Sequence, residues 1–260
     1  MTTALITGAS AGIGTAFAQE LAARKTDLVL VARSETKLQQ LAQQLQDQYR
    51  IHADVIAQDL TAPSAAASVF DAVKQKGLNI DLLINNAGFG QYGAFVELDG
   101  AQQLQAIQLN ILALVDLTHR FLPDMRQRGH GNIVNMASTA AFQPIPYFAI
   151  YAATKAFVLS FSEALWAENR RYGVRVLAVC PGPTDTEFFQ EANFPSRLAK
   201  RAAQNYTSKE VVVKETLAAL EKEASNIVPG AVSNQILANL SRFLPRDTVV
   251  NLIEPYFRKG

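Results

Sequence analysis

The chain has 260 residues, of which 49% are apolar and 18% charged, and its formal net charge is +1. This length suits one large domain over residues 1–260. The near-neutral charge lacks the basic surplus that neutralises nucleic-acid phosphates, so we expect no nucleic-acid partner. The single cysteine, Cys180, allows no intrachain disulfide and favours a reducing, cytoplasmic location. No apolar run reaches the ~20 residues of a membrane span, and no His, Cys and carboxylate spacing predicts a metal site.

Short β-branched runs alternate with longer stretches of helical periodicity along the chain. The expected strands are 4–7, 28–31, 54–57, 82–84, 133–135, 174–179 and, more weakly, 226–228. The expected helices are 13–24, 35–48, 64–76, 98–127, 151–171 and 208–223. This order predicts an α/β fold: a doubly wound, Rossmann-like parallel sheet of about seven strands with helices on both faces. Residues 184–206 and the tail 241–260 show no regular pattern.

The first expected strand ends in a glycine-rich turn that opens the first helix. Glycine permits a tight turn and the close approach of a pyrophosphate, and the free N–H groups of a helix N-terminus bind that phosphate. Between a strand and a helix, the three glycines favour dinucleotide binding over a plain turn. The residues expected at this site are Gly8, Ser10, Gly12, Ile13 and Gly14.

Arg33 follows the second expected strand, at the point that distinguishes the two nicotinamide cofactors. An NAD site carries a carboxylate there for the ribose 2′-hydroxyl, whereas an NADP site carries an arginine for the 2′-phosphate. Ala32 supplies no acid, so we expect a preference for NADP(H), with NAD(H) as the alternative. A solvated surface charge is the other interpretation of Arg33.

Two further strand ends carry residues suited to a nucleotide. Asp59 could accept from the adenine amino group while Leu60 packs on the ring, although an Asp that caps its own loop is a nearly equal alternative. Asn86, Ala87 and Gly88 follow the fourth strand. Their small side chains and amide permit close cofactor approach, although this run alone could be a polar turn.

Tyr151 and Lys155 lie four residues apart on an expected helix and therefore share one face. A free tyrosine has a pKa near ~10, and a nearby ammonium lowers that pKa. The pair could thus give a proton to a carbonyl oxygen or take one from an alcohol. Ser138 ends the fifth strand and could hydrogen-bond the substrate oxygen, and Asn110 is an unusual amide in an apolar helix.

The sixth strand ends in a segment whose backbone and hydroxyl groups are suited to a nicotinamide amide. Its expected contacts are Pro181, Gly182, Thr184 and Thr186.

Together these motifs resemble the short-chain dehydrogenase/reductase family. The matching segments, in the family's order, are TGASAGIG at 7–14, NNAG at 85–88, Asn110, Ser138, YAATK at 151–155 and PGPTDT at 181–186. The resemblance implies that Tyr151 is the general acid or base and that Lys155 binds the nicotinamide ribose. It further implies that Ser138 orients the carbonyl and that Asn110 holds a water in a proton relay. Ala11 departs from the basic residue that members preferring NADP often carry, so the cofactor prediction rests on Arg33.

Aromatic residues are frequent in the segments expected around the substrate. We therefore expect an apolar, fairly bulky ketone, aldehyde or 3-oxoacyl substrate, or the matching alcohol. Region 184–206 would act as a lid, although its rings could simply pack the lid to the sheet. Tyr147 has no lysine one turn on and is expected in the pocket wall. The expected pocket residues are Phe89, Phe142, Tyr147, Phe148, Phe188 and Phe189, with Tyr92 and Phe194 nearby.

We expect a homodimer or homotetramer that pairs through the helices 98–127 and 151–171, as the family commonly does. The tail 241–260 is more apolar than a free terminus should be; it could instead fold over its own subunit or touch a membrane. A non-catalytic dinucleotide-sensing protein is a competing function, but such a protein is expected to lose the tyrosine or the lysine. The apolar tail residues are Phe243, Leu244, Val249, Val250, Leu252, Ile253, Tyr256 and Phe257.

Overall fold

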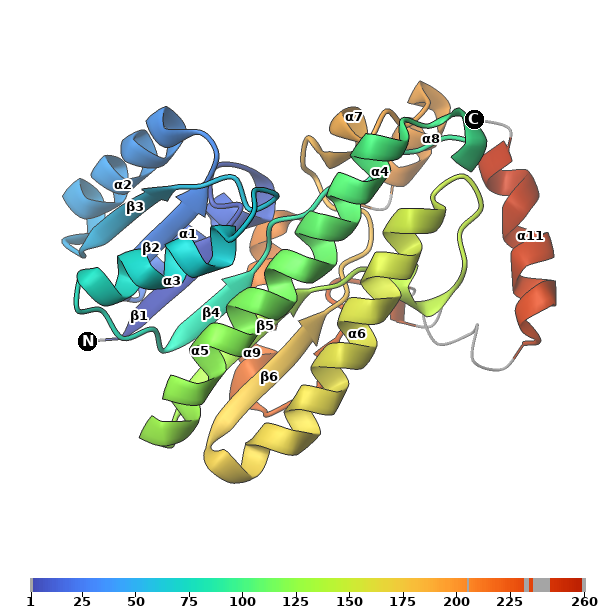
Figure 1. Ribbon diagram of the computed structural model, residues 1–260. Coiled ribbons are helices and arrows are strands. Elements are labelled where there is room, and N and C mark those ends of the chain that lie inside the picture. The colour runs from blue at the N-terminus through green and yellow to red at the C-terminus, as the bar shows by residue number, and fades with distance from the viewer. Residues whose placement is uncertain (1, 205, 232–233, 236–243, 259–260) are drawn as a thin grey trace.

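The computed structural model of the protein describes residues 2–204, 206–231, 234–235 and 244–258. Its centre is a seven-stranded sheet in the order β3-β2-β1-β4-β5-β6-β7, and every strand pair is parallel (Figure 1). The strand order reverses between β1 and β4, which predicts a ligand crevice at their carboxyl ends. The strands are β1 Thr3–Thr7, β2 Asp27–Ala32, β3 Ala53–Ala57, β4 Leu82–Asn85, β5 Gly131–Met136, β6 Val174–Val179 and β7 Asn226–Ile227.

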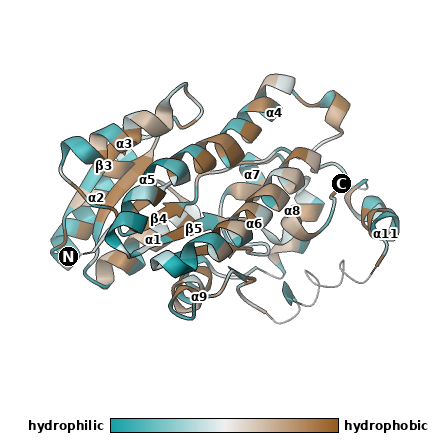
Figure 2. Ribbon diagram, turned by 60° about the horizontal axis from the view of Figure 1, so that its bottom comes forward, coloured by the Kyte–Doolittle hydropathy of each residue, from teal (hydrophilic) through white to brown (hydrophobic). Residues whose placement is uncertain are grey.

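Helices cover both faces of the sheet, as the apolar strands predict. Successive strand residues point to opposite faces, and Ile6 and Leu5 accordingly belong to two separate core clusters. Phe17 and Val212 pack in the first cluster, and Phe121 in the second. In Figure 2 the outer helix α2 is largely teal, while the strands beside it are brown. One face carries α1 Gly12–Ala23, α2 Glu35–Tyr49 and α9 Lys209–Glu221; the other carries α3 Ala65–Gln75, α5 Leu114–Arg128 and α6 Ala149–Asn169.

The long helix expected over 98–127 is divided into three segments. Asp99 caps α4, Gly100–Ile107, by accepting from the N–H groups of Ala101 and Gln102. A π-helix, η2, follows over Gln108–Ala113 and leads directly into α5. The wider turn of a π-helix is rare and often marks a functional position. In this chain it carries Asn110.

The two regions expected to be irregular contain helices, which corrects the sequence analysis. Region 184–206 holds α7, Phe188–Glu191, and α8, Ser196–Ala203. Both are too short for their periodicity to stand out in the sequence. The tail forms α11, Arg246–Arg258, although Pro255 inside it normally argues against a helix. Phe243 and residues 259–260 lie outside the described residues.

Short 3-10 helices complete the connections: η1 Phe95–Glu97, η3 Thr139–Phe142 and η4 Arg170–Tyr172. Among the residues that the structure describes, no helix has the length and apolar character to cross a membrane. Within the same ranges, no group of three or more His, Cys, Asp or Glu side chains could hold a metal ion.

Candidate active site

The glycine turn between β1 and α1 is shaped to receive an anion. Gly8 and Gly12 have φ of +65° and +56°, in the region that favours glycine. A Cβ on Gly14 would lie 2.2 Å from the carbonyl oxygen of Gly8, so only glycine lets the helix begin this close to the strand. Ala11 gives α1 no side-chain cap, which leaves the first N–H groups of the helix for a ligand. These features fit the pyrophosphate of a dinucleotide.

The end of β4 holds the glycine turn in place. The side-chain amide of Asn86 donates to the carbonyl oxygens of Thr7 and Gly8, at 3.0 and 3.2 Å. The Thr7 hydroxyl oxygen accepts from the backbone N–H groups of Asn86 and Ala87, at 2.9 and 3.0 Å. Asn86 therefore positions the turn, and its contact with a cofactor stays a prediction. Of the other expected turn residues, Ser10 is partly exposed and Ile13 packs against the core.

Arg33 and Asp59 lie together beyond β2 and β3. Asp59 accepts from the backbone N–H and the hydroxyl of Thr61, at 2.9 and 2.7 Å, so it caps its own loop. The backbone N–H of Thr61 is the main cause that lowers the pKa of the Asp59 carboxyl, and the charge of Arg33 lowers it further. Arg33 itself is exposed. Its guanidinium therefore stands in solvent near Asp59, and its contact with a cofactor phosphate stays a prediction.

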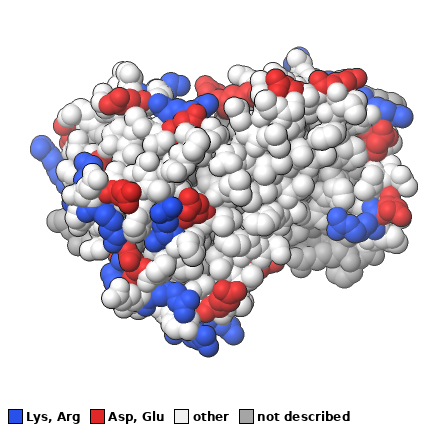
Figure 3. Space-filling view, in the orientation of Figure 1, with Lys and Arg blue, Asp and Glu red and all other residues white. Residues whose placement is uncertain are grey.

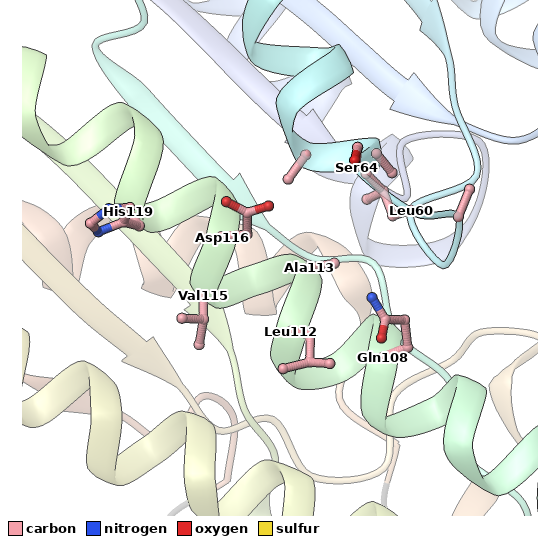
Figure 4. A pocket seen from close by; sticks show the side chains of 11 residues that line it. Leu60, Ser64, Gln108, Leu112, Ala113, Val115, Asp116 and His119 are labelled. Atoms are coloured by element: carbon pink, nitrogen blue, oxygen red, sulfur yellow. The ribbon is translucent and has the colours of Figure 1, made fainter.

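Leu60, the second residue expected near an adenine, is buried and only 5% exposed. It lines a hollow of about 330 Å³ between the start of α3 and the helical segment η2–α5, with Ser64, Gln108 and Asp116 among the polar residues around it (Figure 4). Contact between Leu60 and an adenine ring stays a prediction.

Segment 181–186, after β6, faces the glycine turn. A Cβ on Gly12 would lie 3.2 Å from Cγ2 of Thr186. The carbonyl oxygen of Pro181 accepts from the N–H of Thr139 at 2.9 Å, and the Thr184 hydroxyl donates to the carbonyl oxygen of Gly182 at 3.0 Å. These bonds fix the segment beside the end of β5. The predicted cofactor segments after β1, β4 and β6 thus meet at one edge of the sheet.

Tyr151 and Lys155 lie on α6 next to the end of β5. The Lys155 ammonium donates to the carbonyl oxygen of Met136 at 2.7 Å and lies 5.6 Å from the centre of the Tyr151 ring. Ser138 hydrogen-bonds the Tyr151 side chain. The structure therefore brings the predicted acid, its lysine and the predicted carbonyl-binding serine into one cluster.

Burial controls the protonation of this pair. It raises the pKa of Tyr151 to about 12, against a smaller lowering by the hydrogen bond with Ser138. It also lowers the pKa of Lys155 to about 8, although the nearby Cys180 acts in the opposite direction. The pKa of Tyr151 is therefore raised and not lowered, because burial is the dominant cause. At neutral pH the phenol is a proton donor beside a largely charged lysine.

Asn110 is fixed between the loop after β4 and α6. Its Nδ2 donates to the carbonyl oxygen of Phe89 at 2.9 Å and to the Thr154 hydroxyl at 3.1 Å, and its Oδ1 accepts from the N–H of Phe89 at 3.1 Å. A Cβ on Gly88 would lie 2.9 Å from Asn110 Oδ1 and 3.4 Å from Lys155 Nζ. The amide and the ammonium are therefore neighbours, as a polar relay requires.

Aromatic rings from α7 and the loop before α6 cover Tyr151. The ring of Phe148 stacks on Tyr151 at 4.4 Å between centroids, and that of Phe188 lies 5.2 Å away. Phe194 lies 4.9 Å from Phe148 and 5.0 Å from Phe189. Four rings of the predicted pocket region thus form one apolar cluster against the phenol.

The other expected pocket residues lie outside this cluster. Phe142 packs against the buried cluster that contains Ala137 and Val158, so it belongs to the core. Phe89 contributes its backbone to Asn110. Tyr147 has a φ of +62°, which is strained for a bulky side chain, and its ring lies 6.2 Å from that of Tyr92.

Several residues of the site were not predicted. Thr154 supports Asn110, and Gly90 leaves room for two rings, since a Cβ there would lie 2.7 Å from Tyr151 and 2.8 Å from Phe148. A buried polar chain also runs from Thr118 through Asn85 and Asn135 to Ser162. Its one sequence signal was an asparagine at the end of each of two apolar strands.

The parallel sheet, the glycine turn and the Tyr151–Lys155 pair define a nucleotide-binding oxidoreductase. Residues 2–196 match a family model described as short chain dehydrogenase. The chain belongs to this short-chain dehydrogenase family, which confirms the resemblance found in the sequence.

Among three relatives of this chain, two have names that specify a long-chain or a bulky substrate. A very-long-chain 3-oxoacyl-CoA reductase from Bos taurus is 31% identical over 249 residues, which cover 93% of this chain and 75% of that protein. A short-chain dehydrogenase from Sphingobium yanoikuyae, solved in complex with NADPH, is 36% identical with a TM-score of 0.81, covering 88% of this chain and 87% of that one. A bulky-bulky ketone specific alcohol dehydrogenase from Comamonas testosteroni is 32% identical with a TM-score of 0.77, covering 95% and 96%.

Proposed function

We propose that the protein is an NADP(H)-dependent oxidoreductase that interconverts a bulky apolar ketone and its secondary alcohol. The observation that carries the proposal is the cluster of Ser138, Tyr151 and Lys155 under a cover of aromatic rings, at the same edge of the sheet as the glycine turn. A proton donor, a carbonyl-binding hydroxyl and a cation next to a dinucleotide site are the groups that carbonyl reduction needs.

The proposed mechanism assigns one task to each side chain. Bound NADPH would supply a hydride to the carbonyl carbon of the substrate. Ser138 orients the carbonyl oxygen, and Tyr151 transfers its phenolic proton to that oxygen. Lys155 would hold the nicotinamide ribose hydroxyls of the bound cofactor, and its charge stabilises the phenolate that remains. Asn110 would hold a water that links Lys155 to solvent, as a relay through which the phenolate regains a proton.

Two observations support NADP(H) over NAD(H). Arg33 is exposed beyond β2, and the preceding Ala32 supplies no carboxylate for a ribose 2′-hydroxyl. The Sphingobium relative was solved with NADPH. NAD(H) is the alternative cofactor in the same site. Either would use the contacts proposed at Gly8, Ser10, Gly12, Ile13, Gly14, Asp59, Leu60, Asn86, Ala87, Gly88, Tyr151, Lys155, Pro181, Gly182, Thr184 and Thr186.

A bulky apolar substrate is supported by the rings of Phe148, Phe188 and Phe189 around Tyr151. The names of the Comamonas and bovine relatives agree with it, and a 3-oxoacyl compound is the second substrate type. Within the proposed single catalytic domain, residues 184–206 would be the lid over this substrate. A cytoplasmic location stays a prediction. A non-catalytic sensing protein would have no use for a complete proton-transfer cluster.

A substrate screen tests the proposal directly. Purified protein is mixed with NADPH or NADH and a series of ketones from acetone to diaryl ketones and 3-oxoacyl thioesters, and the loss of cofactor absorbance is followed. We expect turnover of the bulky apolar ketones with NADPH. Turnover restricted to small, charged polyols or hydroxy acids would contradict the substrate class, and binding of cofactor without any turnover would favour the sensing function.

Replacing Arg33 by Ala tests the cofactor preference. The change removes a charge-assisted contact with the 2′-phosphate, so NADPH affinity should fall roughly ten- to a hundredfold, while NADH affinity should hardly change. Fluorescence titration of both cofactors measures this, with Lys214→Ala on α9 as an exposed cation control. Equal weakening of both cofactors would make Arg33 structural and strengthen the NAD alternative.

A further inference from the structure

Tyr92, in the loop after β4, connects the lid to the C-terminal helix. Its backbone N–H donates to the carbonyl oxygen of Ala192 at the end of α7, at 2.9 Å. Its ring lies 4.9 Å from the ring of Phe194. Its hydroxyl donates to the carbonyl oxygen of Phe257 on α11. Tyr92 thus contacts both the lid, residues 184–206, and α11, which begins about 40 residues after the end of the lid.

Two further contacts join α11 to the walls of the same pocket. The Tyr147 hydroxyl donates to a carboxylate oxygen of Glu254 at 3.5 Å. The Arg201 guanidinium, on α8, lies 4.0 Å from the centre of the Tyr256 ring, a cation–π distance. Helix α11 lies beside α8 and the loop that leads into α6, as Figure 1 shows. The helix therefore reaches three separate pocket segments.

These contacts continue inward to the reacting phenol. Phe194 packs on Phe148, which stacks on Tyr151. Tyr147 immediately precedes Phe148, and its strained backbone is held by a hydrogen bond from the N–H of Gly93 to its carbonyl oxygen, at 2.9 Å. A shift of α11 would therefore move both the lid ring Phe194 and the loop at Tyr147.

We infer that Tyr92 and α11 form a clamp across the mouth of the substrate pocket, and that this clamp sets the size of ketone that the site admits. The inference rests on the proposed function. Tyr92, Glu254 and Tyr256 act as positioning residues, because they hold the rings that face the substrate and do not reach the reacting atoms themselves. Val249 is the one fully buried residue of the helix, and Val250, Ile253, Glu254 and Phe257 are half-buried, so a small number of contacts holds the helix in position.

A first experiment needs no substrate. Amide hydrogen exchange over residues 188–203 is measured in the wild type, in Tyr92→Phe, which removes one hydroxyl, and in Tyr256→Ala. We expect about three- to tenfold faster exchange in both variants, because each loses a contact that holds the lid. Leu252→Ala, at a 67% exposed position of the same helix, and Tyr172→Phe, a remote tyrosine on η4, are the matched controls. Unchanged exchange in both clamp variants would overturn the clamp.

The second experiment measures kcat and KM for ketones of increasing size. In Tyr92→Phe and Tyr256→Ala, the ratio of kcat/KM for the largest ketone to that for the smallest should rise about fivefold or more. The NADPH dissociation constant should stay unchanged, because no clamp residue lies at the glycine turn. A size ratio within about twofold of the wild type, or an equal shift in the two controls, would overturn the inference. If the wild type reduces no ketone, the proposed function fails, and the exchange experiment still decides the clamp.

Discussion

In the proposed mechanism, reduction depends on the protonation state of a single residue, Tyr151. Burial holds the pKa of the phenol at about 12, so it arrives at the carbonyl with its proton. The same burial disfavours the phenolate that would follow, so the proposed mechanism requires the neighbouring cation Lys155. A tyrosine and a lysine on an exposed helix surface would have neither this burial nor the raised pKa of the phenol.

Replacing Tyr151 by Phe should lower kcat about 10²–10⁴-fold, because the ring remains and only the acidic hydroxyl is lost. Cofactor affinity should survive. Steady-state kinetics and a fluorescence titration of NADPH measure the two quantities, with Tyr172→Phe as a remote control on η4. Near-normal turnover of Tyr151→Phe would remove the proposed acid and most of the mechanism with it.

Lys155 should make stability depend on pH. Its folded pKa of about 8 lies below the ordinary value of 10.5, so the unfolded chain binds more protons between these values. The free energy of unfolding of the wild type, relative to that of Lys155→Met, should therefore rise as the pH increases from 8 towards 10.5. This gain in stability should be lost again as the pH falls through 8. Urea denaturation of both proteins at several pH values tests this. A difference that is flat or that falls with rising pH would contradict the burial of the ammonium.

At the scale of elements, the helix α4–η2–α5 determines where Asn110 lies. Replacing Asp99 by Ala removes the cap that receives two N–H groups at the start of α4, and should cost about 0.5–2 kcal/mol of unfolding free energy. Ser34→Ala is the matched control, because Ser34 precedes α2 without a side-chain cap hydrogen bond. Urea denaturation distinguishes the two. Equal losses in both variants would show that capping is not the cause.

This helix also shows how far the sequence predicts the elements. Apolar periodicity predicted one helix over 98–127 and the presence of Asn110 on it, because both follow from local pattern. The π-helix at Gln108–Ala113 did not appear in that pattern, since it adds one residue to a turn and depends on tertiary contacts with Phe89 and Thr154. Helices α7, α8 and α11 were missed because they are short or contain proline.

The features of the candidate site also divide into those that the local sequence indicates and those that depend on contacts between distant segments. The glycine turn and the Tyr151–Lys155 pair each lie within a few residues of sequence, so local spacing indicated them, and the other motifs in the family's order favoured a catalytic role over a plain turn and a helix surface. Contacts between distant segments, such as Asn86 with Thr7, follow from strand order and could not be read locally. The sequence identified the aromatic side chains near the site, but it did not show which of them pack in the core and which lie around Tyr151. Phe142 packs against the core, whereas Phe194 joins the cluster at Tyr151.

At the scale of the whole molecule, an uncharged face predicts self-association. Figure 3 shows a broad area without charged side chains over α4, η2 and the beginning of α6. Leu104 on α4, Leu112 on η2 and Phe157 on α6 are 68%, 51% and 41% exposed. Light scattering at micromolar concentration should therefore report a homodimer or homotetramer, and Phe157→Asp should lower the mass. Val211→Asp on α9, 39% exposed, is the control. A monomeric wild type would contradict this prediction.

The strand order bears on how the protein avoids aggregation. Open sheet edges carry unpaired backbone groups that can recruit a strand from another chain. One edge of the described sheet is β7, which is only two residues long. The other is β3, where Asp54 pairs with Lys76 and His52 at 2.7 and 3.1 Å and places charge on the strand. A short edge and a charged edge both disfavour edge-to-edge pairing, so the apolar strands of the interior stay protected at high protein concentration.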